Sequence, residues 1–328
     1  MNELLKEKCE LLADNHEIVR KEFKWDYDMM SVVAGSIFSS AGQKANPEKM
    51  KICREILKKH SKAFSNFRST VELAVISKMA VSNNPENYLE EVMGVYEKIK
   101  GKKIFTSEYM VLAAMCICDQ HKVGQAEEVV EKANKILKKM EAKHPLLTGS
   151  EDTPYATLLA MTDRSVDEIT EDIEKCFTIL KEKFTFHKNA VQGLSMVLAL
   201  KGDDAKSKCE RILQIYQALK DQNVKWGKET ELVALASLLD IDMDVKKLAD
   251  EIADASGYLK KRKGFGDWAM GKEYRSMFAA LITSEVYSDE ASAVNSSLLG
   301  SSLGIIIAEQ VAVMLIVTSS AAATAASN

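Results

Sequence analysis

The stretch that decides the fold covers residues 188–221, KNAVQGLSMVLALKGDDAKSKCERILQIYQALKD. It begins with a short apolar run, Ala190 to Leu200, which is followed by a charged turn. Residues 205–220 then carry apolar side chains at helical spacing with charged residues between them, the pattern of an amphipathic helix. The stretch therefore predicts a hairpin made of one short apolar helix and one amphipathic helix.

The same pair of helices recurs along the chain, and in each first helix an alanine sits inside an apolar run. These alanines, spaced about 40 residues apart, are Ala34, Ala74, Ala114, Ala160, Ala199, Ala236 and Ala280. A hairpin of this size cannot bury its apolar face alone, so it stacks on its neighbours, and small residues permit close packing. We expect an all-α fold of about seven stacked helical hairpins, as an α-solenoid-like array or closed into an α/α ring.

Helix start signals support this pattern in the second helices. Asn46-Pro47-Glu48 and Asn84-Pro85-Glu86 combine an N-capping side chain, a proline at the first helical position and an acidic first turn. Ser165 and Glu168 form a capping-box pattern. These residues predict where three of the amphipathic helices begin.

The chain divides into three predicted segments. Residues 1–26 form an N-terminal amphipathic helix, and residues 27–286 hold the helical-hairpin repeats of about 40 residues. Residues 287–328 form an apolar, Ala/Ser-rich C-terminal helical segment. Within the repeats the longest loop, 144–152, is the only candidate for a hinge between domains.

The C-terminal segment is unusual because Glu309 is its only charged residue between Ser297 and Ala326. A membrane span needs about 20 apolar residues, and a carboxylate within it is costly. We expect a buried terminal helix or helix hairpin first, a self-association surface second and a membrane anchor third.

The composition of the chain bears on its cellular compartment and on the partners that it can bind. The 328 residues carry a net charge of −4, and no basic stripe interleaved with aromatic residues indicates nucleic-acid binding. The six cysteines form no C-x-x-C pair, which favours free thiols in a reducing cytoplasm. The start of the chain lacks the pattern of a signal peptide. A cytoplasmic location is therefore expected.

Residues 266–272, GDWAMGK, satisfy part of a phosphate-binding loop. That loop requires a preceding strand and a following Ser or Thr, whereas here a helix precedes it and Glu273 follows it. We interpret the segment as a turn, with Gly264 ending one helix and Gly271 beginning the next. No nucleotide or other cofactor is predicted.

Asp240, Asp242, Asp244 and Glu251 match four ligand positions of a calcium loop. The position of the required glycine is occupied by Val245, which begins a helical pattern, so capping by Asp242 or Asp244 is the preferred interpretation. The five histidines show no metal-binding spacing. No metal site is predicted.

Arg68 lies in the junction Ser65 to Arg68, an S-x-F-R motif before an expected helix start. It could bind an anion there, but pairing with a neighbouring carboxylate or with a helix C-terminus is favoured. The motif, the Ala-anchored helices and the Ala-rich C-terminus resemble a family of uncharacterised proteins from Gram-positive bacteria, known as a domain of unknown function. The resemblance implies a bacterial, helical protein and carries no catalytic residues.

Three function classes remain after these exclusions. Helical arrays present extended grooves, so the leading hypothesis is a non-enzymatic scaffold that binds a protein partner. The alternative is an enzyme with its active site inside an α/α ring, for which Asp163, Asp203 and Asp240 at the ends of the apolar helices are candidates. A membrane-associated protein that uses the C-terminal segment is the third reading.

Overall fold

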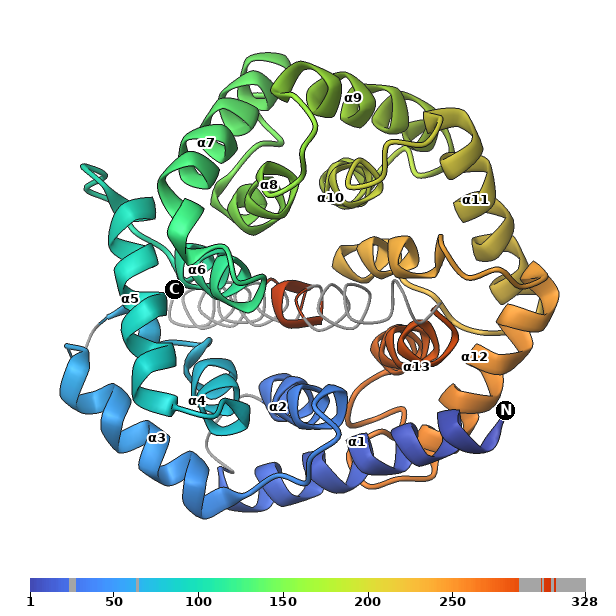
Figure 1. The fold of residues 1–328 in the computed structure, drawn as a ribbon. Coiled ribbons are helices and arrows are strands. Elements are labelled where there is room, and N and C mark those ends of the chain that lie inside the picture. The colour runs from blue at the N-terminus through green and yellow to red at the C-terminus, as the bar shows by residue number, and fades with distance from the viewer. Residues whose placement is uncertain (24–27, 63–64, 289–301, 303, 308–309, 311–328) are drawn as a thin grey trace, which may run out of the picture.

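The computed structural model describes the chain except for residues 24–27, 63–64, 289–301, 303, 308–309 and 311–328. Every regular element among the described residues is helical, which confirms the predicted all-α fold. The helices form two concentric layers around a central axis (Figure 1). Of the two arrangements expected, this part of the chain adopts the ring.

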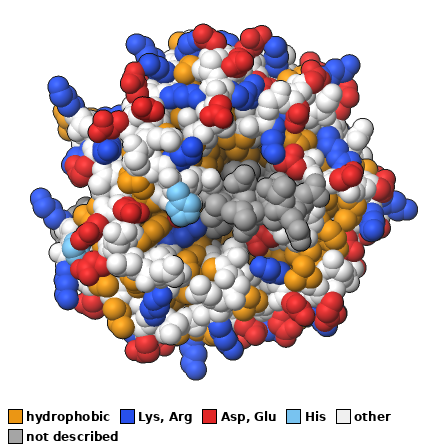
Figure 2. Space-filling model, viewed as in Figure 1, with side chains coloured by type: hydrophobic (Ala, Val, Ile, Leu, Met, Phe, Trp, Pro, Cys, Tyr) orange, Lys and Arg blue, Asp and Glu red, His pale blue; other side chains and the backbone are white. Residues whose placement is uncertain are grey.

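The outer layer consists of amphipathic helices, and charged side chains of both signs lie around the outside of the molecule (Figure 2). These helices are α1 (Glu3–Glu22), α3 (Pro47–His60), α5 (Pro85–Lys100), α7 (Ala126–Lys143), α9 (Val166–Lys183), α11 (Ala205–Asp221) and α12 (Val245–Lys260). In α7, for example, the buried residues Val129, Ala133, Ile136 and Met140 recur every three or four positions, so one face packs inward.

The inner layer consists of shorter, more apolar helices. They are α2 (Asp28–Ser40), α4 (Glu72–Val81), α6 (Glu108–Asp119), α8 (Thr153–Ala160), α10 (Lys188–Leu198), the 3-10 helix η4 (Thr230–Leu238) and α13 (Lys272–Tyr287). Inner helices pack against outer helices on one side and against each other on the other, which is why α6 buries every residue from Tyr109 to Cys118.

The alanines singled out in the sequence fall on or directly after inner helices, one in each, and all are buried except the partly buried Ala236. Small residues let the layers approach closely. At Gly35 in α2, a Cβ atom would lie 2.8 Å from the backbone nitrogen of His16 in α1. This spacing leaves no room for a larger residue at that crossing.

Three predicted helix starts are confirmed by their hydrogen bonds. Asn46 and Asn84 accept bonds from the backbone N–H groups of Lys49 and Asn87, at 3.1 Å each. Ser165 and Glu168 form the expected capping box at the start of α9. These caps satisfy N–H groups that the helix itself leaves without partners.

Each inner helix follows the end of an outer helix along the chain, which gives the ring two distinct ends. Where the inner helices finish, Lys78 of α4 pairs with Asp119 of α6 at 2.7 Å, and Ser284 of α13 donates to the carbonyl of Ser237 in η4 at 2.6 Å. We call this the exit end. It carries loops 41–46, 82–84, 120–125, 161–165, 199–204 and 239–244.

The opposite end, where the inner helices begin, is called the entry end. Its loops lead from an outer helix to the next inner helix. They are 61–71, 101–107, 144–152, 184–187, 222–229 and 261–271, of which 63–64 are not described, and they include the short helices η1 (Asn66–Arg68) and η3 (Ser150–Asp152). The loop 144–152 joins α7 to α8 within the wall of the ring.

Contacts between the first and last parts of the chain close the ring. The terminal amine of Met1 lies 3.3 Å from Glu251 and 2.6 Å from Asp254, both in α12. Further along α1, Glu17 pairs with Lys263 at 3.0 Å. Helix α1 therefore lies beside α12 and completes the outer layer (Figure 1).

The predicted C-terminal segment falls mostly on residues outside the described part. Its described members Ser302 and Ile305 to Ile307 are buried, and Ser302, Ile305 and Ile306 pack beside Cys116 of α6. For these residues the expected burial is observed. None of the helices formed by the described residues is both long and apolar enough to cross a membrane.

All six cysteines are buried free thiols, as predicted. Burial raises the pKa of Cys9, Cys116 and Cys118 to about 12 in each case. A thiol with such a pKa is almost entirely protonated at neutral pH and is a poor nucleophile. These cysteines therefore belong to the core.

Candidate functional site

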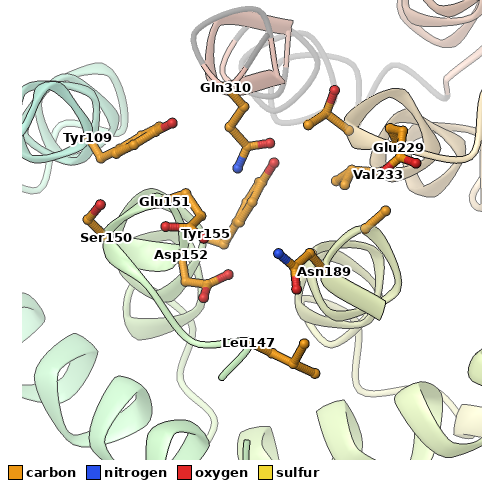
Figure 3. Close-up of a pocket in the computed structure, with 13 residues that line it drawn as sticks. Tyr109, Leu147, Ser150, Glu151, Asp152, Tyr155, Asn189, Glu229, Val233 and Gln310 are labelled. Carbon is orange, nitrogen blue, oxygen red and sulfur yellow. The ribbon is translucent and has the colours of Figure 1, made fainter. Parts of the chain in front are cut away.

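A pocket of about 380 Å³ lies at the entry end, among the first turns of α6, α8, α10 and η4 (Figure 3). Its charged members are all acidic: Glu151, Asp152 and Glu229. The other residues that line it are Tyr109, Leu147, Ser150, Tyr155, Asn189, Ala190, Gly193, Thr230, Val233 and Gln310. Four inner helices therefore supply one concave, partly apolar surface with a few polar groups, as is typical of small-molecule sites.

The segment Gly149 to Tyr155 builds one wall of the pocket. The backbone N–H of Gly149 donates to Asp152 Oδ2 at 3.0 Å, which folds the loop into η3. Pro154 follows in the first turn of α8, where its missing N–H costs nothing. The local sequence therefore ends the loop tightly and presents Glu151, Asp152 and Tyr155 together.

Asp152 is the most perturbed carboxyl group of the pocket. Its side chain is 4% exposed, and this burial raises the pKa to about 7. The nearby charge of Glu151 raises the pKa further, whereas hydrogen bonds from Gly149 and from Gln192 Nε2, at 3.0 Å, lower it. Asp152 thus changes its protonation state near neutral pH, which is unusual for an aspartate.

Tyr155 stands beside Asp152 with its side chain buried. Burial raises the pKa of its hydroxyl well above the ordinary value, so the group is a neutral donor at physiological pH. Figure 3 shows its hydroxyl directed toward the Gln310 side chain, while the Asn189 amide is turned toward Asp152. A ligand in the pocket would meet these polar groups together.

Glu229 lies across the pocket, at the start of η4. His187 Nδ1 lies 2.8 Å from its Oε1, and this contact holds the carboxylate at the pocket edge. The next acidic residue, Glu231, is buried, and burial raises its pKa. Since the described pocket lining contains no Lys or Arg, its electrostatic potential is negative and disfavours anions.

The acidic candidates from the sequence lie at the other end of the ring. Asp163, Asp203 and Asp240 are exposed on exit-end loops, and Asp240 pairs with Lys201 at 2.6 Å. They are not brought together at the pocket because they follow the inner helices, whereas the pocket lies where these helices begin.

Other sequence candidates have structural roles. Arg68 lies 4.0 Å from Glu72, as the carboxylate interpretation predicted. Asp244 caps α12 by accepting bonds from Lys246 and Lys247. In the segment 266–272, Gly271 precedes α13 and Asp267 pairs with Arg275 at 2.7 Å. Among the described residues, no group of three metal-binding side chains is gathered.

Sequence reasoning missed Asp152, Tyr155, Gln192 and Glu229. The available signal was the adjacent pair Glu151 and Asp152 in a loop with Pro145 and Gly149, directly before an apolar helix. The length of this loop predicts a hinge, whereas its acidic pair alone does not indicate that Asp152 is buried. Gln192 and Glu229 carry no local signal, since only the packing of α8, α10 and η4 against one another brings them near Asp152.

Comparison with known proteins identifies the family of the chain. A family model described as a protein of unknown function, DUF4003, matches residues 15–312. The chain belongs to this family. No curated protein and no solved structure matches it. The match covers the pocket and most of the ring, and it confirms the expected resemblance to a helical family of unknown function.

Proposed function

We propose that the protein binds a small polar molecule, uncharged or cationic, in the entry-end pocket and acts on it by acid–base chemistry through Asp152. The observation that carries this proposal is a buried carboxyl group with a pKa of about 7 in the wall of a 380 Å³ pocket. Strongly perturbed titratable groups in clefts are candidates for functional sites.

The charge of the pocket supports the class of ligand. Glu151 and Glu229 place two further carboxyl groups around the cavity, and the lining within the described chain holds no cationic side chain. An anionic ligand would be repelled, whereas hydroxyl and amine groups would find acceptors. Tyr109 and Tyr155 add aromatic surface against which an apolar part of the ligand can pack.

The environment of Asp152 supports its role as a proton donor and acceptor. A general acid or base works best when its pKa lies near the operating pH, because both protonation states are then populated. The bonds from Gly149 and Gln192 both use Oδ2, so Oδ1 is the oxygen that we expect to contact the ligand. These two bonds would hold the carboxyl in one orientation during proton transfer.

The test is a ligand screen by thermal shift, with cationic, polyhydroxylated and anionic compound sets, followed by turnover assays on the compounds that bind. Asp152→Asn keeps the shape and the acceptor oxygen but removes the titratable group, so binding should persist while turnover falls at least about a hundredfold. Asp163→Asn is the matched control, since it changes an exposed aspartate at the exit end.

Two results would contradict the proposal. Preferential stabilisation by anionic compounds would exclude the assigned ligand class. Turnover that Asp152→Asn leaves unchanged would exclude this carboxyl group as the acid or base.

A protein-interaction scaffold of helical repeats, in the cytoplasm, remains a second proposal. It is supported by the regular alternation of outer and inner helices with the period seen in the sequence. Because the inner helices are buried, such a scaffold would use the outer helices or the loops. Capture of a specific protein that is lost on substitution of outer-helix residues would support it.

A further inference from the structure

Large apolar side chains stand fully exposed on the loops of the entry end. They are between 89% and 103% exposed, and they are Ile104, Phe105, Leu146, Phe186 and Trp268. Each lies in a loop that leads to an inner helix, so all five project at the same end of the ring. Single exposed apolar residues are common on protein surfaces, but the gathering of five large ones on the loops of one end indicates a surface that is covered in use.

Basic residues lie beside the apolar tips on three of the four loops, whereas the loop of Leu146 also carries Glu151 and Asp152 of the pocket. Every outer helix has at least one Lys or Arg in its last turn, which lies at the entry end. Lys102 and Lys103 directly precede Ile104, Lys183 and Lys188 flank Phe186, and residues 260–263 (KKRK) precede Trp268. A depression of about 230 Å³ beside this loop is lined by His16, Glu17, Arg20, Lys21 and Lys263.

The exit end has the opposite character. Its loops 199–204 and 239–244 carry Asp203, Asp204, Asp240, Asp242 and Asp244. The first turns of several outer helices, which begin at this end, add further acidic residues. The net charge of the chain is −4, so the basic residues at the entry end are a local concentration and not a property of the whole protein.

We propose that the entry end docks on an anionic membrane surface, with Phe105, Phe186 and Trp268 inserted at the level of the lipid headgroups. Lysines near an anionic bilayer are attracted to it electrostatically, and aromatic side chains are favourable in the interfacial region. The combination of apolar and basic residues on one face is typical of proteins that lie on a membrane. This inference stands independently of the proposed chemistry of Asp152.

The distribution of the apolar residues favours a bilayer over a protein partner. A protein interface needs a contiguous, well-packed apolar core with a polar rim. Here the five apolar side chains are spread over four separate loops around the ring, with lysines near them. A fluid lipid surface accepts each tip separately, since it needs no complementary shape.

Flotation of the full-length protein with vesicles tests this assignment. The protein should float with phosphatidylglycerol vesicles and not with phosphatidylcholine vesicles, and added salt should weaken the binding. Trp268→Ser should reduce the affinity about tenfold through lost apolar contact. Lys102→Glu should reduce it at least about fivefold, because each lysine near the surface adds to the attraction.

Matched controls use residues of the same kind elsewhere on the protein. Ile52→Ser changes an exposed apolar residue on the outer helix α3, and Lys44→Glu changes an exposed lysine on an exit-end loop. Both should leave flotation unchanged. Equal binding to both vesicle types, no binding, or equal loss with the control variants would overturn the proposal. So would a dimer in solution that Trp268→Ser dissociates, since the tips would then serve a second copy of the chain.

Discussion

Gln192 Nε2 lies 3.0 Å from Asp152 Oδ2 and 3.1 Å from the carbonyl oxygen of Leu147. One amide group thus links helix α10 to the loop before α8 and fixes the carboxyl group of the pocket. The bond from Gln192 lowers the pKa of Asp152, but burial has the larger effect and keeps it raised. The state of Asp152 is therefore set by two elements that the packing of the neighbouring helices α8 and α10 brings together.

The raised pKa of Asp152 predicts a pH-dependent contribution to stability. An unfolded aspartate is ionised above pH about 4, whereas the folded group holds its proton up to pH about 7. The folded state binds more protons in this window, so this contribution falls as the pH rises from 4 to 7, by about 4 kcal/mol at most. Asp152→Asn should remove this dependence.

Urea denaturation of the wild type and Asp152→Asn at acidic and mildly alkaline pH measures this effect. The free-energy difference between the two proteins should shift in favour of the variant as the pH rises. Asp163→Asn, at an exposed site, should follow the wild type at every pH. A constant difference between wild type and Asp152→Asn would show that the carboxyl group has an ordinary pKa.

Replacing Gln192, which donates a hydrogen bond to Asp152, should raise the pKa of Asp152. Gln192→Leu removes the side-chain bond to Asp152 and leaves the bond from Gly149. The bond from Gln192 favours the ionised form of Asp152. Its loss should therefore raise the pKa of Asp152 by about one unit. Titration of the side-chain carboxyl followed by carbon NMR measures the change, and an unchanged or lowered pKa would contradict it.

The local features of the fold could be predicted from the sequence because their causes are local. Asn46, Asn84 and Ser165 cap helices by bonds to residues three positions away. The spacing of apolar residues likewise distinguishes the buried inner helices from the half-buried outer helices. The sequence does not decide between an open array and a closed ring. Closure depends on pairs such as Glu17 and Lys263, which no sequence pattern connects.

The pocket is also difficult to predict from the sequence, because its residues come from several different inner helices. Asp163 and Asp240 were plausible because both follow an apolar helix, but whether a site forms before or after these helices depends on the packing of the whole ring. Asp152 and Glu229 lie far apart in sequence and meet only through α8, α10 and η4. A high pKa is a consequence of burial, and burial of a single aspartate is not encoded by its neighbours alone.

The buried ion pair of Asp172 and Lys208 should be important for stability. Lys208 Nζ lies 3.1 and 2.8 Å from the two carboxylate oxygens, and Arg164 Nη1 lies 2.9 Å from Oδ2. Removing one partner of a buried pair leaves an uncompensated charge, so Asp172→Ala should cost about 3–5 kcal/mol. Lys135→Ala, which breaks the exposed pair with Glu131, should cost at most about 0.5 kcal/mol. Similar losses for both variants in urea denaturation would contradict this assignment.

Two glycines at the end of the outer layer should respond in opposite directions to the same substitution. Gly264 has a φ of +88°, and a Cβ atom there would overlap the ring of the buried His16 in α1. The ring of His16 also packs edge-on against Phe265 at 5.1 Å, so it cannot move away easily. Gly264→Ala should therefore destabilise the protein by about 2 kcal/mol or more.

Gly257 supplies the matched comparison because it is exposed within α12, and a Cβ atom there would meet nothing within 4 Å. Alanine at this position should stabilise the protein by about 0.5–1 kcal/mol, since it restricts the unfolded chain and favours the helix. Urea denaturation of both variants gives the two signs directly. If Gly264→Ala proved neutral, the loop after α12 would not press against α1, and the contact that closes the ring there would be absent. If Gly257→Ala also destabilised the protein, its outward side of α12 would have to be covered by another surface.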